Sequence, residues 1–232
     1  MKKTVLFLLR FVSILFISFF KILNKGFVCK SKGVLFIKLK LKGSVKVILN
    51  SGYVVNSRFI INGNGNVLLF DDDVKINHCQ FIINGDNCLI DLRGSRIIKN
   101  SKFELLDSNT QITIGNNTGF NNNRILVAGF GNKINIGKEC IFAENAELWA
   151  SDTHSIIDLE TEKRLNPDLP IIIEDYVWIC NRVLVMKGVH IESNSVIASG
   201  SIVTKNIGKN AIAAGIPATI IKENIKWDIN RI

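Results

Sequence analysis

An aliphatic residue recurs at every sixth position in the last third of the chain, within residues 173–204. The repeated positions are Ile173, Ile179, Val185, Ile191, Ile197 and Val203. A second small or β-branched residue follows most of them four positions later, at Val177, Val183, Val189, Ser195 and Ser201. A period of six fits neither an amphipathic helix nor a single alternating strand. It predicts an all-β solenoid of short strands that turns a corner at every repeat and points its aliphatic residues inward.

The same spacing is visible earlier in the chain, where it is less regular. It passes through Ile114, Phe120, Leu126, Ile136, Phe142 and Leu148. Residues 61–98 read as irregular turns of the same solenoid, separated by Asn and Gly corners that tolerate positive φ. Residues 151–170 are polar, contain two prolines and interrupt the repeat. A long loop without its own period inside a compact repeat is usually functional, so we expect a catalytic loop here.

The two ends of the chain depart from the repeat. Residues 1–30 are basic and hydrophobic, and residues 4–20 form an apolar run interrupted by Arg10. This run is shorter than the roughly 20 residues of a spanning helix. It is expected either to contact a membrane, as an interfacial helix or weak signal anchor, or to cap the open end of the solenoid. The solenoid is expected over 31–216, and the tail 217–232 is expected to end in a short helix.

The chain of 232 residues has a formal charge of +9, and much of the excess lies near the N-terminus. A basic apolar segment indicates an anionic membrane surface or an acidic ligand. No nucleic-acid recognition module is visible, so nucleic acid is not an expected partner. The five cysteines form no CxxC pair and are expected to be small buried apolar residues in the reducing cytoplasm. We expect a cytoplasmic protein, peripheral at the inner face of the plasma membrane if the N-terminus binds lipid.

The three histidines are His78, His154 and His190, and only His154 lies in the loop that breaks the repeat. Neutral imidazole accepts a hydroxyl proton near pH 7, so His154 is the candidate general base. Asp152 is placed either to orient its ring or to remain a solvated loop carboxylate. The wide spacing of the histidines and the lack of paired ligands predict no metal site within one subunit.

The combined pattern resembles the hexapeptide-repeat acyltransferases. The likeness is carried by Ile-Gly at 114–115 and 136–137, by the His-bearing loop, and by the segments DYVWICNRVLVMKGVHI and IASGSIVTKNIGKNAIAAGIPATIIK. It is strong over about 112–225 and closest to bacterial O-acetyltransferases of capsule, O-antigen and exopolysaccharide synthesis. It implies a left-handed parallel β-helix that forms homotrimers, with active sites between subunits and acetyl-CoA along the coil edge.

The resemblance also implies roles for individual residues. His154 matches the family's loop base, and Trp178 matches the tryptophan beside the acyl group, where the alternative is a packing role. The matches to residues that line the cofactor acetyl-CoA are Asn181, Ser199, Thr204, Lys205 and Lys222. Asn121 lies near the family's acceptor-binding asparagine. Cys180 stands where the family usually has Gly, and Val127–Gly129 replaces an acidic acceptor-binding pair of the simple sugar acetyltransferases, which indicates a different acceptor.

These observations lead to one preferred function and two alternatives. The preferred function is acetyl-CoA-dependent O-acetylation of a sugar hydroxyl on a bacterial surface polysaccharide or its precursor, by direct transfer with His154 as base. An N-acyltransferase acting on an amino sugar would use the same base and cofactor groove. A non-catalytic β-solenoid scaffold would bind no acetyl-CoA. The sequence does not separate the first two.

Overall fold

The computed structural model describes residues 27–29, 33–35, 37–49, 53–70 and 74–231. The N-terminal helix expected within residues 1–30 lies outside these ranges. Strand β1 (Phe27–Cys29) already belongs to the solenoid, so the coil begins earlier than the expected boundary at residue 31. Among the described residues, no helix has the length and apolar character needed to cross a membrane.

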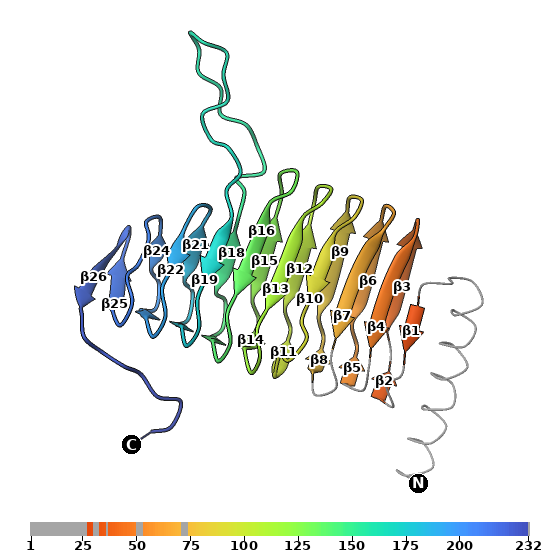
Figure 1. Cartoon of the computed structure of the whole chain (residues 1–232), viewed down its shortest axis with the longest axis horizontal. Coiled ribbons are helices and arrows are strands. Elements are labelled where there is room, and N and C mark those ends of the chain that lie inside the picture. The colour runs from red at the N-terminus through yellow and green to blue at the C-terminus, as the bar shows by residue number, and fades with distance from the viewer. Residues whose placement is uncertain (1–26, 30–32, 36, 50–52, 71–73, 232) are drawn as a thin grey trace.

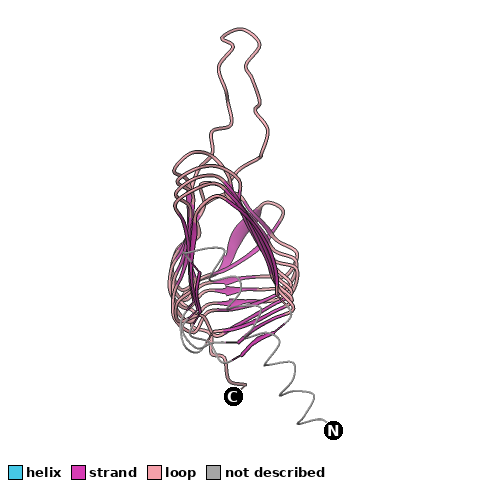
Figure 2. Ribbon diagram, turned by 90° about the vertical axis from the view of Figure 1, so that its right-hand side faces the viewer, coloured by secondary structure: helices cyan, strands magenta, loops and turns pink. Residues whose placement is uncertain are grey.

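The chain winds through three sheets that form the faces of a triangular prism, as Figures 1 and 2 show. From β1 to β24, successive strands enter sheets A, B and C in turn. Sheet A contains β1, β4 (Val45–Leu49), β7 (Asn66–Phe70), β10 (Leu89–Asp91), β13 (Gln111–Ile114), β16 (Lys133–Ile136), β19 (Ile171–Ile173) and β22 (His190–Ile191). Sheet B contains β2 (Gly33–Leu35), β5 (Tyr53–Val55), β8 (Lys75–Asn77), β11 (Ile97–Lys99), β14 (Gly119–Asn121), β17 (Ile141–Phe142), β20 (Trp178–Ile179), β23 (Val196–Ile197), β25 (Ile212–Gly215) and β26 (Ala218–Lys222). Sheet C contains β3 (Lys38–Lys42), β6 (Arg58–Asn62), β9 (Gln80–Asn84), β12 (Lys102–Leu105), β15 (Arg124–Val127), β18 (Glu147–Trp149), β21 (Leu184–Met186) and β24 (Ile202–Val203).

The predicted parallel solenoid is confirmed by these sheets and by their core. The six aliphatic residues of the hexad repeat are each at most 2% exposed and pack in one continuous apolar column inside the prism. In the turns before the loop, phenylalanines fill the interior. The rings of Phe59, Phe81 and Phe103 stack on one another with centroid separations of 4.8 and 5.2 Å. The predicted burial of Cys79, Cys88 and Cys140 is also confirmed, whereas Cys180 is only partly buried.

The length of a turn changes at the loop. Before the loop, Phe81 pairs with Phe103, a separation that is not a multiple of six. After it, Val185 pairs with Val203, three hexads further along the chain. Only the turn directly after the loop is therefore a whole number of hexads long, because the last turn is shorter and pairs Ile191 with Ile207.

The expected inward position of Leu126 is wrong. Its neighbours in the chain point into the core, and Leu126 lies on the outer face of sheet C, next to Trp149 in the register. A count of six fails here because an early turn is not a whole number of hexads long.

Left-handed residues mark the corners of the prism. The corner between sheets B and C has positive φ at Asn56, His78, Asn100, Asn122, Asn145 and Arg182. The corner between sheets A and B has positive φ at Asn117, Glu139, Tyr176, Asn194 and Asn210. Asn predominates because it tolerates this conformation better than other side chains do. At the same A/B corner, a Cβ on Gly115 would lie 2.7 Å from the Gly137 carbonyl carbon, which explains the Ile-Gly motif.

The C-terminal segment forms no helix in its described residues, contrary to the sequence expectation. Strand β26 turns back and pairs antiparallel with β25. The following tail then runs beneath the last turns of the coil (Figure 1). Its backbone bonds to the corner of the solenoid, with Ile225 N donating to Asn210 O at 3.0 Å. These contacts replace a short helix, which would be only marginally stable on its own.

Candidate active site

The interrupting loop, residues 151–170, replaces one corner between sheets C and A and projects away from the prism (Figures 1 and 2). Asn166 joins its two ends. The Asn166 side-chain amide donates to Asp152 Oδ2 at 2.7 Å and to the His154 carbonyl at 2.9 Å. Its oxygen accepts from the Ile156 N–H at 2.7 Å. The backbone on both sides of the candidate base is therefore held by one buried side chain.

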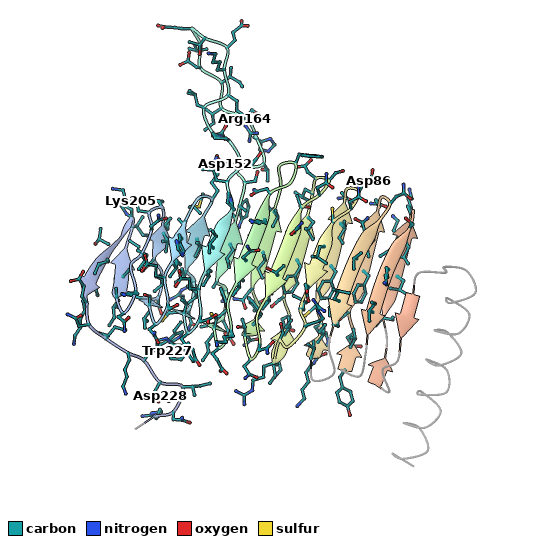
Figure 3. The ribbon with its side chains drawn as sticks, in the orientation of Figure 1. Asp86, Asp152, Arg164, Lys205, Trp227 and Asp228 are labelled. Atoms are coloured by element: carbon teal, nitrogen blue, oxygen red, sulfur yellow. The ribbon has the colours of Figure 1, made fainter. Side chains whose placement is uncertain are left out.

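Two ion pairs strengthen the base of the loop. Lys187, from the C/A corner of the next turn, contacts Asp152 at 2.5 Å. Arg164 donates to Asp168 at 2.9 and 3.1 Å, and the Ser151 hydroxyl donates to the same carboxylate. Figure 3 shows Asp152 and Arg164 above the coil where the loop leaves it. The loop stem is thus fixed, although the loop itself extends into solvent.

The carboxylates in the stem are held ionised. The Lys187 ammonium group, followed by the Asn166 amide, lowers the pKa of Asp152 below its ordinary value. Burial alone would raise the pKa of Asp168, but the Arg164 guanidinium and the Ser151 hydroxyl lower it overall. Asp152 is accordingly neither a solvated carboxylate nor bonded to the His154 ring. It orients the loop backbone through Asn166.

His154 differs from the other two histidines in its surroundings. Its ring is exposed, and among the described residues no hydrogen bond or ion pair is made by its imidazole. His78 is a left-handed corner residue beside Asn56, and His190 contacts Glu174 at 2.8 Å. His154 is therefore the one of the three whose ring makes no hydrogen bond or ion pair within the described residues.

A groove of about 570 Å³ crosses the outer face of sheet C from the B/C corner to the loop stem. Its lining residues are Asn145, Glu147, Trp149, Asp152, Arg182, Val183, Leu184 and Met186. Trp149 donates its indole N–H to Glu147 at 2.7 Å, and the Arg124 guanidinium lies 4.7 Å from its ring centroid. An apolar floor with a few charged groups is the usual composition of a small-molecule site.

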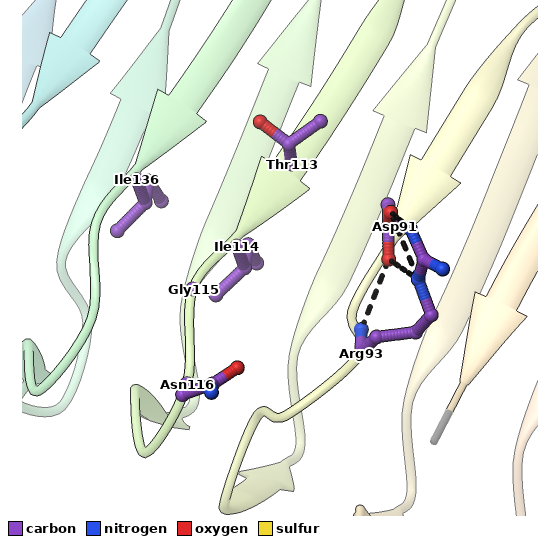
Figure 4. Close-up of a pocket in the computed structure, with 7 residues that line it drawn as sticks. All are labelled: Asp91, Arg93, Thr113, Ile114, Gly115, Asn116 and Ile136. Atoms are coloured by element: carbon purple, nitrogen blue, oxygen red, sulfur yellow. Dashed lines mark hydrogen bonds and ion pairs between the residues drawn. The ribbon is translucent and has the colours of Figure 1, made fainter.

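A second hollow, of about 470 Å³, lies on sheet A in the turns before the loop (Figure 4). Asp91 is its only described lining carboxylate, and Arg93 donates to it at 2.6, 2.9 and 3.1 Å. A carboxylate occupied in this way is poorly placed to accept a substrate proton. The hollow is therefore a weaker candidate for the reaction than the loop.

The residues that the sequence resemblance assigned to the cofactor, the acyl group and the acceptor lie on different sides of the coil within one chain. Thr204 and Lys205 follow β24 at the C/A corner, which also bears the loop. Asn181 and Ser199 follow β20 and β23 at the B/C corner and stack in consecutive turns. All four are exposed.

The remaining matches lie on sheet B. Asn121 ends β14, and its amide donates to Glu144 at 2.9 Å. Trp178, 38% exposed, begins β20, and Lys222 ends β26. Figure 3 shows Trp227, whose ring centroid is 5.9 Å from that of Trp178, on the side of the coil opposite the loop. Within one chain, therefore, the loop that bears His154 and the Trp178 side chain lie on opposite sides of the coil.

Several residues of the site were missed from the sequence. Asn166 and Lys187 act through contacts across the loop, which no local pattern displays. Trp149 had a usable signal, because a tryptophan stands two residues before the repeat breaks. Trp227 bonds to a residue 51 positions earlier, so its place was not readable from spacing.

Comparison with known proteins places these features in a family. A family model described as bacterial transferase hexapeptide (six repeats) matches residues 170–205. The crystal structure of the polySia-specific acetyltransferase NeuO is 33% identical, covers 89% of this chain and 91% of that chain, and superposes with a TM-score of 0.68. The chain belongs to the hexapeptide-repeat acetyltransferases.

Other members of this family show similar relationships. The polysialic acid O-acetyltransferase OatWY is 26% identical, with 86% of this chain and 91% of that chain covered and a TM-score of 0.59. A polysialic acid O-acetyltransferase from Escherichia coli O1:K1 / APEC is 42% identical over 89 residues, which are 38% of this chain and 29% of the relative. The galactoside O-acetyltransferase of Escherichia coli K12 is 52% identical over 54 residues, 23% of this chain and 27% of the relative. These two alignments span less than a third of each curated relative. The expected resemblance is confirmed.

Proposed function

We propose that this acetyltransferase transfers an acetyl group from acetyl-CoA to a hydroxyl of a bacterial surface polysaccharide or its precursor. The observation that carries the proposal is the likeness to the polySia-specific enzyme NeuO along 89% of the chain. It is supported by the loop histidine and by the groove that reaches the loop stem on the outer face of sheet C. We place the reaction in the cytoplasm, at the inner face of the membrane.

The chemistry is a direct transfer. His154 removes the proton of the sugar hydroxyl as its oxygen attacks the thioester carbonyl carbon. The C–S bond then breaks, and the proton passes from the imidazolium to the leaving CoA thiolate. The Trp178 indole N–H or a backbone N–H would stabilise the oxyanion. Asn181, Ser199, Thr204, Lys205 and Lys222 are proposed to hold the CoA chain, and the lysines would pair with its phosphates.

The groove on sheet C is the proposed acceptor site. Trp149 offers an aromatic surface for the apolar side of a sugar ring, and Glu147 and Asp152 offer acceptors for its hydroxyls. Arg182 lines the groove and is placed to pair with an acidic sugar, whereas the Arg124 guanidinium is already bound to Glu104 at 2.6 Å. The groove ends at Asp152, two residues before the base, so an acceptor bound there reaches the loop.

A homotrimer completes the site in this proposal. Within one chain the loop stem at Asp152 and the Trp227 ring that packs on Trp178 lie on opposite sides of the prism (Figure 3), so in this proposal a neighbouring subunit supplies either His154 or Trp178. The projecting loop also exposes apolar side chains that suit a protein contact, including Leu159 at 98%, Leu165 at 59% and Ile156 at 57%. Such exposure is typical of an interaction surface.

The test is transfer by the purified full-length protein and by His154→Ala. We expect acetyl-CoA binding to remain and the transfer rate to fall at least about 100-fold, the usual contribution of a general base. Mass spectrometry of the glycan reports each added acetyl, and mild alkali distinguishes an ester from an amide. Ser155→Ala, also exposed in the loop, is the control. Near-normal transfer by His154→Ala would falsify the assignment of the base.

A further inference from the structure

The C-terminal tail is fastened to the outside of the A/B corner at two points. Ile225 and Asn210 exchange two hydrogen bonds of 3.0 Å, one from the Ile225 N–H and one from the Asn210 side chain. Two residues later, the Trp227 indole N–H donates to the Tyr176 carbonyl at 2.6 Å. Asn210 and Tyr176 belong to corners two turns apart, with Asn194 between them. The tail therefore lies across three successive turns.

Burial on sheet B supports this placement. Val196 alternates with the inward Ile197 and lies between Trp178 and Ile212 in the register, so its side chain faces outward. It is nevertheless only 8% exposed and lies outside the core column. The tail, held on both sides of this strand, is the segment in position to cover it. A packed outer layer thus adjoins Trp178.

Trp227 brings its ring to Trp178. The two centroids are 5.9 Å apart and the planes are inclined at 46°, within the range of favourable aromatic pairs. Trp178 keeps 38% of its surface exposed, so part of its ring stays open to solvent beside Trp227. The indole N–H of Trp227 is already used by Tyr176, and its ring is thereby fixed.

The partner of Trp227 is itself unusual. Tyr176 has φ 56°, at a corner where three of the five left-handed non-glycine residues are Asn. A bulky residue in this region strains the backbone, and such strain is often retained at functional sites. The strained peptide presents its carbonyl to Trp227.

We propose that Trp227 is a positioning residue for Trp178, and that the tail forms the wall which limits the thioester to a short acyl group. This inference rests on the proposed acetyl transfer, because Trp178 matters to acyl size only if the acyl group lies beside it. The ligand class is a short-chain acyl-CoA, with the acyl carbons against the Trp178–Trp227 pair and a longer chain excluded by Trp227.

The experiment compares binding of acetyl-CoA and butyryl-CoA to the full-length protein by calorimetry. A hydrophobic wall discriminates by about 10-fold or more for each methylene group. Butyryl has two methylene groups more than acetyl, so we expect the wild type to prefer acetyl-CoA at least about 100-fold, and Trp227→Ala to reduce this preference to within about threefold. Trp227→Phe should restore most of it, because the ring is kept while the indole N–H is lost.

The control is Ile229→Ala, in the same tail and exposed, which should leave the preference unchanged. Thermal melting of each variant separates selectivity from folding, since a purely structural tail would lower the melting temperature and weaken both thioesters equally. An equal loss of both, an unchanged preference in Trp227→Ala, or no preference in the wild type overturns the inference. A wild type that binds neither thioester overturns it as well. If the wild type prefers acetyl-CoA over butyryl-CoA but transfers no acetyl group to any glycan, the proposed function is contradicted and this inference is not.

Discussion

A single buried amide, Asn166, holds together the two ends of the loop that bears His154. It donates to Asp152 and to the His154 carbonyl, and it accepts from the Ile156 N–H. All of its contacts are made to the loop or its stem. Its role is therefore to set where the imidazole stands, while the chemistry belongs to His154.

Asn166→Ala should reduce turnover more than it weakens acetyl-CoA binding. The Ile156 N–H and the His154 carbonyl would lose their partner, whereas Asp152 would keep Lys187. An unpaired buried group costs about 1–3 kcal/mol. We expect the transfer rate to fall about tenfold or more and the loop to become more sensitive to protease, because about 1.4 kcal/mol corresponds to a factor of ten. Steady-state kinetics and limited proteolysis measure the two effects.

Glu160→Ala serves as the control, because Glu160 is exposed at the far end of the loop. Its kinetics and protease sensitivity should match the wild type. If Asn166→Ala keeps both full turnover and a protected loop, the amide has no role in positioning His154.

Among the structural elements, the B/C corner contains a residue, Arg182, whose backbone conformation lowers stability while its side chain lines the proposed acceptor groove. Arg182 occupies a left-handed position at the B/C corner, where four of the preceding residues are Asn. It also lines the groove beside Trp149. A residue that strains the backbone and lines a groove is a candidate for selection by function.

Arg182→Asn should stabilise the protein and impair acceptor binding at the same time. Relief of the left-handed strain is expected to raise the free energy of unfolding by about 1 kcal/mol. Loss of the guanidinium should raise the KM for the glycan, while the KM for acetyl-CoA stays unchanged. Chemical denaturation and two-substrate kinetics test this prediction.

The matched comparison is Asn122→Ala, at the same corner one turn before Asn145. This change should destabilise the protein, because it removes the Asn122–Asn145 side-chain bond of 2.6 Å and places alanine at positive φ. If Arg182→Asn proved less stable than the wild type, backbone strain at residue 182 would not be the main effect of this position on the free energy of unfolding.

The sequence predicts the elements best where the repeat is regular. Three hexads complete the turn that directly follows the loop, so the inward residues from Ile173 to Val203 were predictable by counting. The last turn, in which Ile191 pairs with Ile207, is shorter and departs from the count. A turn before the loop is not a whole number of hexads, and the count fails at Leu126 for that reason. The left hand of the coil came from the family resemblance and stays a prediction.

The candidate site was predictable in part. The loop and its histidine stood out because they break the repeat. The clamp of Asn166 and Lys187 and the docking of Trp227 were not predictable, because each joins segments distant in sequence. The expected terminal helix failed because the tail finds its hydrogen-bond partners on the corner of the solenoid.

For the whole molecule, the separation of His154 and Trp178 predicts complementation between two inactive variants. In the proposed homotrimer, assemblies that mix His154→Ala and Trp178→Ala subunits would contain some sites with both native residues. Random association in a cyclic trimer leaves about a quarter of the sites intact, so about a quarter of wild-type activity should return. Each variant is assayed alone and after joint refolding.

The joint refolding of His154→Ala with itself is the control and should give no activity. Lack of recovery in mixtures that sedimentation shows to be trimeric would place both residues in one subunit's site. Mass photometry of the wild type provides the independent measure of assembly.

The shortening of the turns after the loop has a consequence for how such enzymes vary. Each turn of a solenoid contacts only its neighbours, so whole turns can be inserted or lost without disturbing the rest. The turns before the loop carry the long strands of sheet C, and those after it carry the proposed cofactor residues. Duplicating one early turn would lengthen the outer face by about 4.8 Å and leave the chemistry in place. The number of turns before the loop therefore sets the length of the outer face, measured from the loop.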